Sequence, residues 1–167
     1  MSWQPYVDTQ LMQKHGKTGS TTNVSEHAAI YGHNGTLWAA SPGFSLATRE
    51  VEVATEEGGS EQITMNEFEN MANTFQNNGV CSKKGGLRIN GVKCFLVRYD
   101  PMMKVAYLKK SQGGAAIAKT NRTFIVATFN QEKEATLPDG KKVPQNPGLT
   151  NTCVENLAIA LTDADFQ

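Results

Sequence analysis

The apolar residues at the start of the chain follow the spacing of a helix. Trp3 and Tyr6 lie three residues apart, and Val7 and Leu11 lie four apart, so the members of each pair share one side of a helix. Ser2 supplies an N-cap, and a proline falls in the first turn, where backbone N–H groups have no intrahelical partner. We expect a short N-terminal helix whose aliphatic pair faces the domain and whose aromatic pair lies near the domain's edge. Taken alone, the aromatic pair is interpreted as core anchors.

Alternating apolar and polar positions indicate strands in the middle of the chain. After a connector rich in Gly, Thr, Ser and Asn (16–25), the apolar runs 27–31 and 36–40 flank an Asn-Gly turn, which is a strong hairpin signal. The second run carries Trp38. Between residues 87 and 129, alternating segments are separated by turns that contain Gly, Pro or Asn. This region predicts a meander of successive antiparallel strands.

The stretch between the hairpin and the meander is predicted to be helical. The acidic segment 48–61 is interpreted as a short helix that runs into a mobile loop. Thr64 and Glu67 form a capping box, which predicts the start of an amphipathic helix, and Gly79 is placed to end that helix. Its apolar stripe has the spacing i, i+3, i+4, i+7 and comprises Phe68, Met71, Ala72 and Phe75.

The end of the chain predicts a loop followed by a final helix. The loop spans 131–147, and the helix is expected to end near Asp165-Phe166. Its apolar stripe of helical period comprises Cys153, Val154, Leu157, Ala158, Ala160, Leu161 and Ala164. The order of elements predicts an α+β domain with a central antiparallel sheet, the N- and C-terminal helices packed together on one face, and further helices on the other. The 167 residues fit a single domain, 1–167.

Charge is segregated along the chain although the formal net charge is zero. Residues 49–69 contain seven glutamates and one arginine, whereas residues 83–122 contain ten lysines and arginines against one aspartate. A basic half of this kind can steer acidic partners, whether protein, anionic lipid head groups or nucleic acid.

The sequence contains no motif that indicates reaction chemistry. The three cysteines form no CxxC pair, and neither they nor the three histidines have metal-ligand spacing, so we expect reduced thiols, no metal and no cofactor. Phosphate-binding glycine motifs are missing, which leaves the Gly-Gly pairs as turns. No apolar run is long enough for a membrane span, and the N-terminus lacks a signal-peptide pattern. We expect a soluble, intracellular binding protein rather than an enzyme.

Several segments, in this order, resemble the profilins, the small actin-monomer-binding proteins of eukaryotic cytoplasm. The matching segments are Met1–Gln4, Tyr6–Asp8, Ala29–Gly32, Leu37–Ser41, Gly43–Leu46, Gly86–Arg98, Gly113–Ala115 and Val154–Ala158, together with Leu161. The resemblance implies a cytoplasmic, cytoskeletal monomer that binds actin monomers and proline-rich segments of actin-regulating proteins such as filament nucleators, and thereby controls filament assembly. The chain is longer than most profilins, and the excess falls in two insertions, at about residues 50–84 and 131–147.

The resemblance implies a polyproline-binding site between the two terminal helices. The matching positions are Trp3, Tyr6, Trp38, Leu161 and Phe166. Under this interpretation Trp3 and Tyr6 form half of an exposed aromatic groove rather than core anchors. The family commonly has an aromatic residue or His where this chain has Ala160, and often a terminal Tyr where it has Phe166. We therefore expect weaker polyproline binding than in the fuller site.

The resemblance also implies an actin-binding face on the central strands and the start of the last helix. The matching positions are Lys93, Arg98, Lys109, Lys110, Asn151 and Glu155. Phosphoinositide head groups are a secondary candidate ligand for the same basic region.

Two other functions compete with this interpretation. The first is a nucleic-acid-binding module that uses the basic sheet, with Phe95, Tyr99 and Tyr107 for base stacking. The second is a small enzyme with Cys94 or Cys153 as nucleophile, for which the sequence shows no base. Both are less favoured than the profilin interpretation, which implies no nucleic-acid partner.

Overall fold

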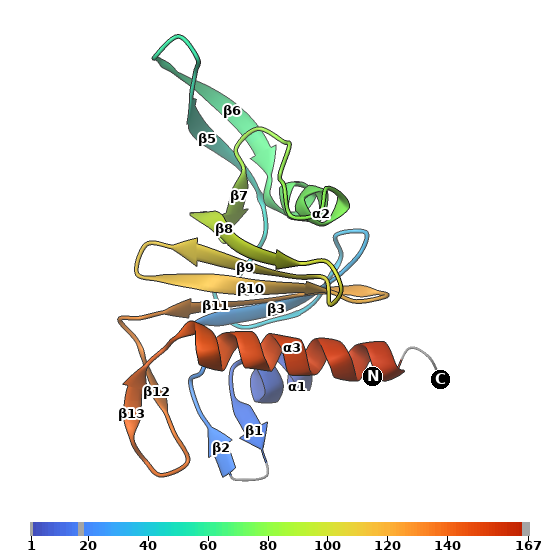
Figure 1. Cartoon of the computed structure of the whole chain (residues 1–167), viewed down its shortest axis with the longest axis vertical. Coiled ribbons are helices and arrows are strands. Elements are labelled where there is room, and N and C mark those ends of the chain that lie inside the picture. The colour runs from blue at the N-terminus through green and yellow to red at the C-terminus, as the bar shows by residue number, and fades with distance from the viewer. Residues whose placement is uncertain (1, 17–18, 165–167) are drawn as a thin grey trace.

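The structure is a computed structural model that describes residues 2–16 and 19–164, with the backbone alone for residues 14–16 and 19–21 (Figure 1). Its centre is a seven-stranded antiparallel sheet in the order β4-β3-β11-β10-β9-β8-β7. The strands are β3 (His27–Gly32), β4 (Leu37–Ala40), β7 (Leu87–Ile89), β8 (Val92–Asp100), β9 (Val105–Lys110), β10 (Gly113–Lys119) and β11 (Thr123–Asn130). The predicted hairpin and the predicted meander are both confirmed.

The helices from the two ends of the chain lie together on one face of this sheet (Figure 1). The first helical segment consists of α1 (Gln4–Tyr6), which continues directly into the wider π-helical turn η1 (Val7–Leu11). The last helix is α3 (Pro147–Ala164). Val7 and Leu11 are fully buried, as the aliphatic pair was predicted to be. They share a core with Cys153, Val154, Leu157, Ala158 and Leu161 of α3 and with one face of the sheet.

Ser2 is not the N-cap of the first helix. Trp3 holds that position, and the Ser2 hydroxyl accepts a hydrogen bond from the backbone N–H of Gln4 at 3.3 Å. Within α3, Ala160 and Ala164 of the predicted stripe are exposed. The expected end of this helix near Asp165-Phe166 lies outside the described residues.

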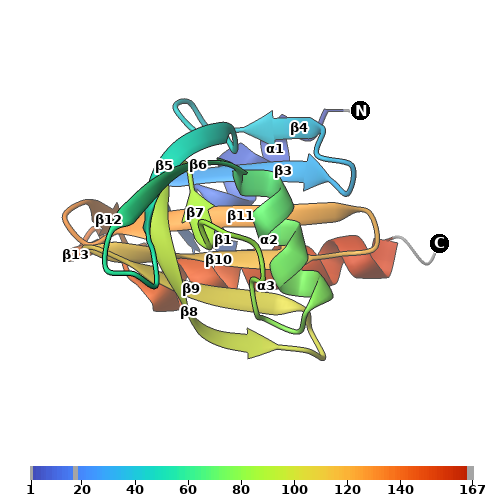
Figure 2. The ribbon, with the colours of Figure 1, turned by 90° about the horizontal axis from the view of Figure 1, so that it is seen from above.

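The opposite face of the sheet is covered by α2 (Glu67–Gln76), which Figure 2 shows crossing the strands from above. Met71 and Phe75 are buried there, and Phe75 packs edge-on against Phe124 of β11 with ring centroids 5.4 Å apart. The α+β class with terminal helices on one face is thus confirmed. Among the described residues the second face carries one helix, whereas the sequence predicted several.

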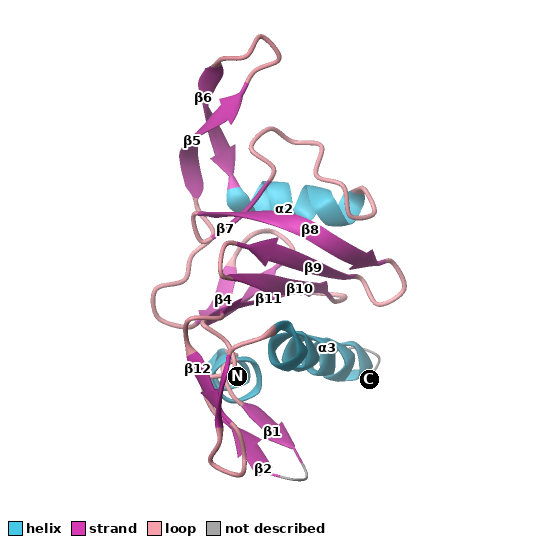
Figure 3. Cartoon of the chain, turned by 60° about the vertical axis from the view of Figure 1, so that its left-hand side comes forward, coloured by secondary structure: helices cyan, strands magenta, loops and turns pink. Residues whose placement is uncertain are grey.

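The predicted acidic helix over 48–61 is wrong, because this region forms a hairpin of β5 (Thr48–Ala54) and β6 (Ser60–Asn66) that projects from the sheet (Figure 3). Glutamates and β-branched residues alternate along β5, with Val51 buried and its neighbours Glu50 and Glu52 exposed. This period of two is the strand pattern. The predicted capping box is also wrong, since Thr64 belongs to β6. The N-cap is Asn66, whose side chain accepts a hydrogen bond from the Glu69 N–H at 3.0 Å.

Two segments predicted as a connector and a loop contain short hairpins. Strand β1 (Lys14–Gly16) pairs with β2 (Gly19–Thr21), and β12 (Glu134–Thr136) pairs with β13 (Lys142–Pro144). A bridge between Thr22 and Thr136 joins the two. Strands of three residues are too short to show an alternating pattern, so backbone pairing rather than sequence period defines them. In the part of the chain that the structure describes, no helix is both long and apolar enough to cross a membrane.

Candidate functional site

Three aromatic rings gather where the N-terminal helix meets strand β4. The centroids of Trp3 and Tyr6 are 5.4 Å apart, and those of Trp3 and Trp38 are 5.0 Å apart. All three side chains are half-buried, and they pack against the core that contains Leu161. We call Trp3, Tyr6, Trp38 and Leu161 the aromatic groove, after the groove that the sequence resemblance implies at these positions. The structure therefore brings together Trp3, Tyr6 and Trp38 of the five residues predicted for the polyproline site, and Leu161 belongs to the core against which they pack.

Local contacts fix the rings of the aromatic groove. The side-chain amide of Gln4 donates a hydrogen bond to the Ala40 carbonyl at 2.9 Å, which ties α1 to the end of β4. Trp38 lies against Gly32 of the neighbouring strand, where a Cβ atom would come within 3.0 Å of the indole Nε1. The missing side chain at Gly32 allows the indole to lie close to the strand.

The C-terminal part of the aromatic groove offers little exposed apolar surface. Leu161 is only 7% exposed and belongs to the core against which the rings pack, and its neighbour Ala160 is exposed but small. Phe166, the fifth predicted residue, lies outside the described residues. The half of the groove formed by α1 and β4 therefore carries most of the contact area that the described residues can offer.

The predicted basic face lies on β8, β9 and the first half of α3. The Arg98 guanidinium lies 4.5 Å from the centroid of the Tyr107 ring, and the Tyr107 hydroxyl donates to Glu155 Oε1 at 2.6 Å. Burial and this hydrogen bond raise the pKa of Tyr107 to about 12. Lys93 places its ammonium 5.8 Å from the centroid of the Phe95 ring. Arg98, Tyr107 and Glu155 thus connect strand and helix through charge-assisted contacts.

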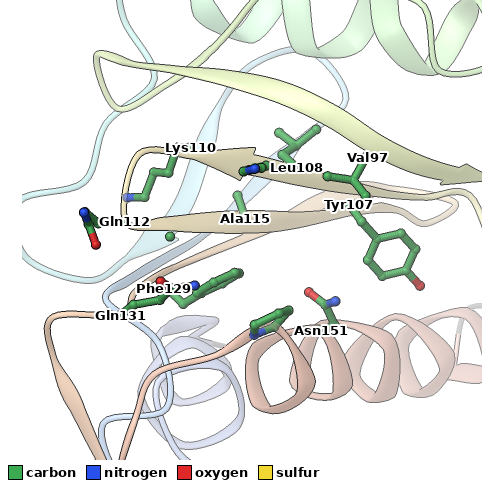
Figure 4. Close-up of a pocket in the computed structure, with 12 residues that line it drawn as sticks. Val97, Tyr107, Leu108, Lys110, Gln112, Ala115, Phe129, Gln131 and Asn151 are labelled. Carbon is green, nitrogen blue, oxygen red and sulfur yellow. The ribbon is translucent and has the colours of Figure 1, made fainter.

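A hollow of about 460 Å³ opens between these strands and the start of α3 (Figure 4). Lys109 and Lys110 of β9 and Asn151 of α3 are among the residues that line it. Lys109 is exposed and pairs across the sheet with Phe95 of β8. We call Lys93, Arg98, Lys109, Asn151 and Glu155, together with the apolar residues among them, the basic face.

The ammonium of Lys110 is directed to a different partner. It forms an ion pair with Glu26 at 2.9 Å, in which the two side chains are only 10% and 13% exposed. Successive residues of a strand point to opposite faces, so Lys109 and Lys110 do not present their charges together. Burial opposes ionisation of Glu26, but hydrogen bonds from Lys110 and Asn130 outweigh burial and hold the pKa of the carboxyl below its usual value.

Sequence reasoning missed the apolar centre of the basic face. Phe95 and Val97 are 62% and 66% exposed, beside Lys93 and Arg98. A bulge between Leu96 and Arg98 shifts the register against β9, so the strand loses its simple alternation there. The signal in the sequence was the apolar run from Phe95 to Val97, which departs from the alternation of apolar and polar residues expected for a strand with one exposed face.

The competing functions receive little support from the same region. Of the three aromatic residues proposed for base stacking, only Phe95 is exposed, whereas Tyr99 is half-buried and Tyr107 is buried. Burial raises the pKa of the Cys94 thiol to about 11, so at neutral pH it is not the thiolate that nucleophilic catalysis requires. Residues 2–16 and 19–164 contain no group of three His, Cys, Asp or Glu side chains that could hold a metal ion.

A curled antiparallel sheet with both terminal helices on one face, aromatic rings beside them and a mixed basic and apolar face together characterise a small α+β domain. A sequence model of the profilin family matches residues 1–166. The chain therefore belongs to the profilin family.

Individual relatives agree with this assignment. The chain is 35% identical to a profilin of Tetrahymena pyriformis over 143 residues, which cover 84% of this chain and 89% of the relative. It is 28% identical to profilin-2 of Acanthamoeba castellanii over 166 residues, covering 99% of this chain and all of the relative. The solved structure of A. castellanii profilin IA matches with a TM-score of 0.65 at 26% identity, covering 98% of this chain and 99% of that one.

Proposed function

We propose that this profilin binds actin monomers through the basic face and proline-rich segments through the aromatic groove, and so controls filament assembly as a cytoplasmic monomer. The packing of the Trp3 ring, in tilted contact with the rings of both Tyr6 and Trp38, is the observation that carries the proposal for the groove. Family membership carries the proposal for actin, because profilins are non-enzymatic actin-binding proteins.

The chemistry of the aromatic groove suits a polyproline II helix. Such a helix is already extended before binding and loses little conformational entropy when it docks. Proline rings stack on flat aromatic surfaces, and the backbone carbonyls of the ligand have no internal partners. The indole N–H and phenol O–H groups of the groove can donate to those carbonyls. Because Ala160 and Leu161 add little exposed area, binding should be weaker than in a groove with aromatic residues on both sides.

Titration with a proline-rich peptide tests the groove. The chain contains two tryptophans, and both lie in the groove, so intrinsic fluorescence reports on this site. Replacing an aromatic anchor of an interface typically costs 2 kcal/mol or more, so Trp3→Ala should weaken peptide binding at least about 30-fold by calorimetry. Phe95→Ala, an exposed aromatic residue of the basic face, is the matched control and should bind normally. An unchanged fluorescence signal at millimolar peptide would refute the groove.

The basic face combines the features of a protein-binding surface. Phe95 and Val97 supply exposed apolar area, and cations surround them. Interfaces typically have an apolar centre that carries affinity and a polar rim that sets orientation and association rate. Actin is the proposed partner. The Lys110 ammonium is already paired with Glu26, so we leave Lys110 out of the proposed contacts.

Charge reversal tests the basic face. The double variant Lys93→Glu/Arg98→Glu should weaken binding to actin monomers at least about tenfold, because two attractive rim charges become repulsive. Binding is measured by sedimentation equilibrium or fluorescence anisotropy, with circular dichroism to verify the fold. Lys141→Glu/Lys142→Glu, at exposed positions in the β12–β13 hairpin, reverses as many charges and should change little. Full actin binding by the first variant would show that the face is misassigned.

Phosphoinositide head groups are a second proposed ligand of the basic face. Lysines and arginines near a membrane surface each contribute about 1 kcal/mol of attraction to anionic lipid. The exposed side chains of Lys93, Arg98 and Lys109 meet this requirement. Co-sedimentation with phosphoinositide vesicles should be reduced in the same double variant.

A further inference from the structure

The Tyr107 side chain lies between two opposite charges of the basic face. The Arg98 guanidinium lies over its ring, 4.5 Å from the centroid, and its hydroxyl donates a hydrogen bond to Glu155 Oε1 at 2.6 Å. Figure 4 shows the ring reaching from β9 toward α3. Tyr107 therefore contacts the cation through its ring and the anion through its hydroxyl group.

The Tyr107 ring has a fixed position, whereas the two charged side chains have room to move. Tyr107 is only 8% exposed and shares a core with Val154 and Leu157 of α3. Burial and the Glu155 carboxylate raise the pKa of Tyr107, so its hydroxyl keeps its proton and remains a donor at neutral pH. Arg98 is exposed and Glu155 is half-buried, and both side chains have several rotatable bonds.

Arg98 and Glu155 do not pair with each other, although both contact Tyr107. Among the described side chains, no ion pair joins Arg98 to Glu155 or to another carboxylate. A guanidinium has five N–H donors around its edge, and contact with a ring face leaves most of these donors available. Two of them can bind a carboxylate side by side. Arg98 can therefore receive an acidic side chain of a partner as long as Glu155 stays bound to Tyr107.

We propose that Tyr107 is a positioning residue of the basic face, which supports Arg98 on its ring and occupies Glu155 with its hydroxyl, so that the guanidinium stays available to a carboxylate of actin. The proposal rests on the proposed binding of actin by the basic face. An ion pair between Arg98 and Glu155 would compete with actin for the same N–H donors. Tyr107 prevents that competition without contributing a charge of its own.

The variant Tyr107→Phe tests this role, because it keeps the ring and removes only the hydroxyl. The released Glu155 carboxylate can then pair with Arg98. Affinity for actin monomers, measured by fluorescence anisotropy, should fall about three- to fivefold, as expected when one rim charge is lost to the partner. Tyr99→Phe on β8 is the matched control. Its ring still packs against Phe75, and it should bind actin normally.

Two double-mutant cycles separate this role from a general effect on the fold. Tyr107→Phe is also made in a Glu155→Gln background, which has no carboxylate to capture Arg98, and in an Arg98→Gln background, which has no guanidinium to be captured. In either background, adding Tyr107→Phe should change the affinity for actin less than about twofold. A hydroxyl that only stabilised the fold would weaken binding equally in all three backgrounds. Urea unfolding of each variant verifies that it is folded.

Three outcomes would overturn the proposal. If the natural chain binds actin and Tyr107→Phe binds it as tightly, the positioning role is refuted and the proposed function stands. If Tyr107→Phe weakens binding to the same extent in all three backgrounds, the hydroxyl does not act through Arg98 and Glu155. If the natural chain does not bind actin, the proposed function is refuted, and the role of Tyr107 with it.

Discussion

At the scale of single residues, Glu67 joins three parts of the structure that lie far apart in the sequence. Its side chain is fully buried at the start of α2. One carboxylate oxygen pairs with Arg49 Nε at 2.9 Å and accepts from the Ala47 N–H at 2.9 Å, and the other accepts from the Gly91 N–H at 2.6 Å. Glu67 thereby fixes the segment before β5 and the β7–β8 turn to the helix.

Replacing Glu67 should strongly destabilise the protein. Glu67→Gln leaves an amide facing three donors in a buried site, and breaking a buried pair in this way costs about 3 kcal/mol. Glu69→Gln, an exposed carboxylate in the same helical turn, should cost less than about 1 kcal/mol. Urea unfolding of both variants measures the difference, and equal midpoints would contradict the role assigned to Glu67.

The direction and the partner of the Lys110 side chain do not follow from the resemblance between sequences. Lys109 and Lys110 match the family as neighbours, yet strand geometry sends their side chains to opposite faces. That divergence could have been predicted from the period of the strand. The identity of the Lys110 partner could not, because Glu26 lies 84 positions away in the chain and only the order of the sheet brings it near.

At the scale of elements, the polar cluster around Glu26 ties three strands together on the face opposite Lys109. Glu26, just before β3, accepts hydrogen bonds from Lys110 of β9 and from Asn130 of β11. Since these contacts hold the Glu26 pKa below its ordinary value of 4.5, the ionised carboxyl is favoured in the folded state. The stability it contributes is therefore fully present above about pH 4.5 and is lost as pH falls through the lower folded pKa.

Acid unfolding tests this link between the strands. Between pH 6 and pH 3 the natural chain should lose more unfolding free energy than Glu26→Gln, which has no carboxyl to protonate at that position. Urea unfolding at each pH provides the comparison. Parallel pH profiles for the two proteins would show that the ion pair does not contribute to stability.

The elements differ in how much of them the sequence could predict. The hairpin around Trp38 and the meander were predicted because turn residues separate alternating runs. The β5–β6 hairpin was not predicted, because the acidic composition of 48–61 obscures the short alternation of Glu50, Val51, Glu52 and Val53. The capping-box pattern placed Thr64 at a helix start, so the strand that pairs with β5 was not predicted either.

At the scale of the whole molecule, α3 serves both proposed binding surfaces. Asn151 and Glu155 in its first half lie at the basic face, and Leu161 in its last turns supports the aromatic groove. The two surfaces share a helix but, among the described residues, no side chain. Binding at separate sites on a rigid body is expected to be additive.

Actin and a proline-rich peptide should therefore bind at the same time. The affinity for actin monomers, measured by anisotropy, should change less than about twofold when the groove is saturated with peptide. A groove-deficient Trp3→Ala protein provides the control for effects of the peptide on actin itself. Mutual exclusion of the two ligands would show that the surfaces overlap or that α3 moves on binding.

Most of the architecture followed from the sequence at this scale, because helix periods at both ends and strand periods between them allow few arrangements. The sites followed only in part. Trp3, Tyr6 and Trp38 belong to elements that were predicted correctly, so their meeting could be anticipated from the resemblance. The exposure of Phe95 and Val97 depends on a bulge in β8, which the apolar run from Phe95 to Val97 signals only indirectly.

The projecting β5–β6 hairpin makes this profilin easy to tag. Its turn holds exposed Glu56 and Glu57 beside Gly58, where a side chain would meet no other atom within 4 Å of its Cβ. The hairpin extends from the sheet on the side of α2, away from α1 and α3 (Figure 1). Exposed loop tips tolerate insertions well. A fluorescent label or an epitope placed in this turn would report the position of the protein in a living cell while leaving both chain ends native.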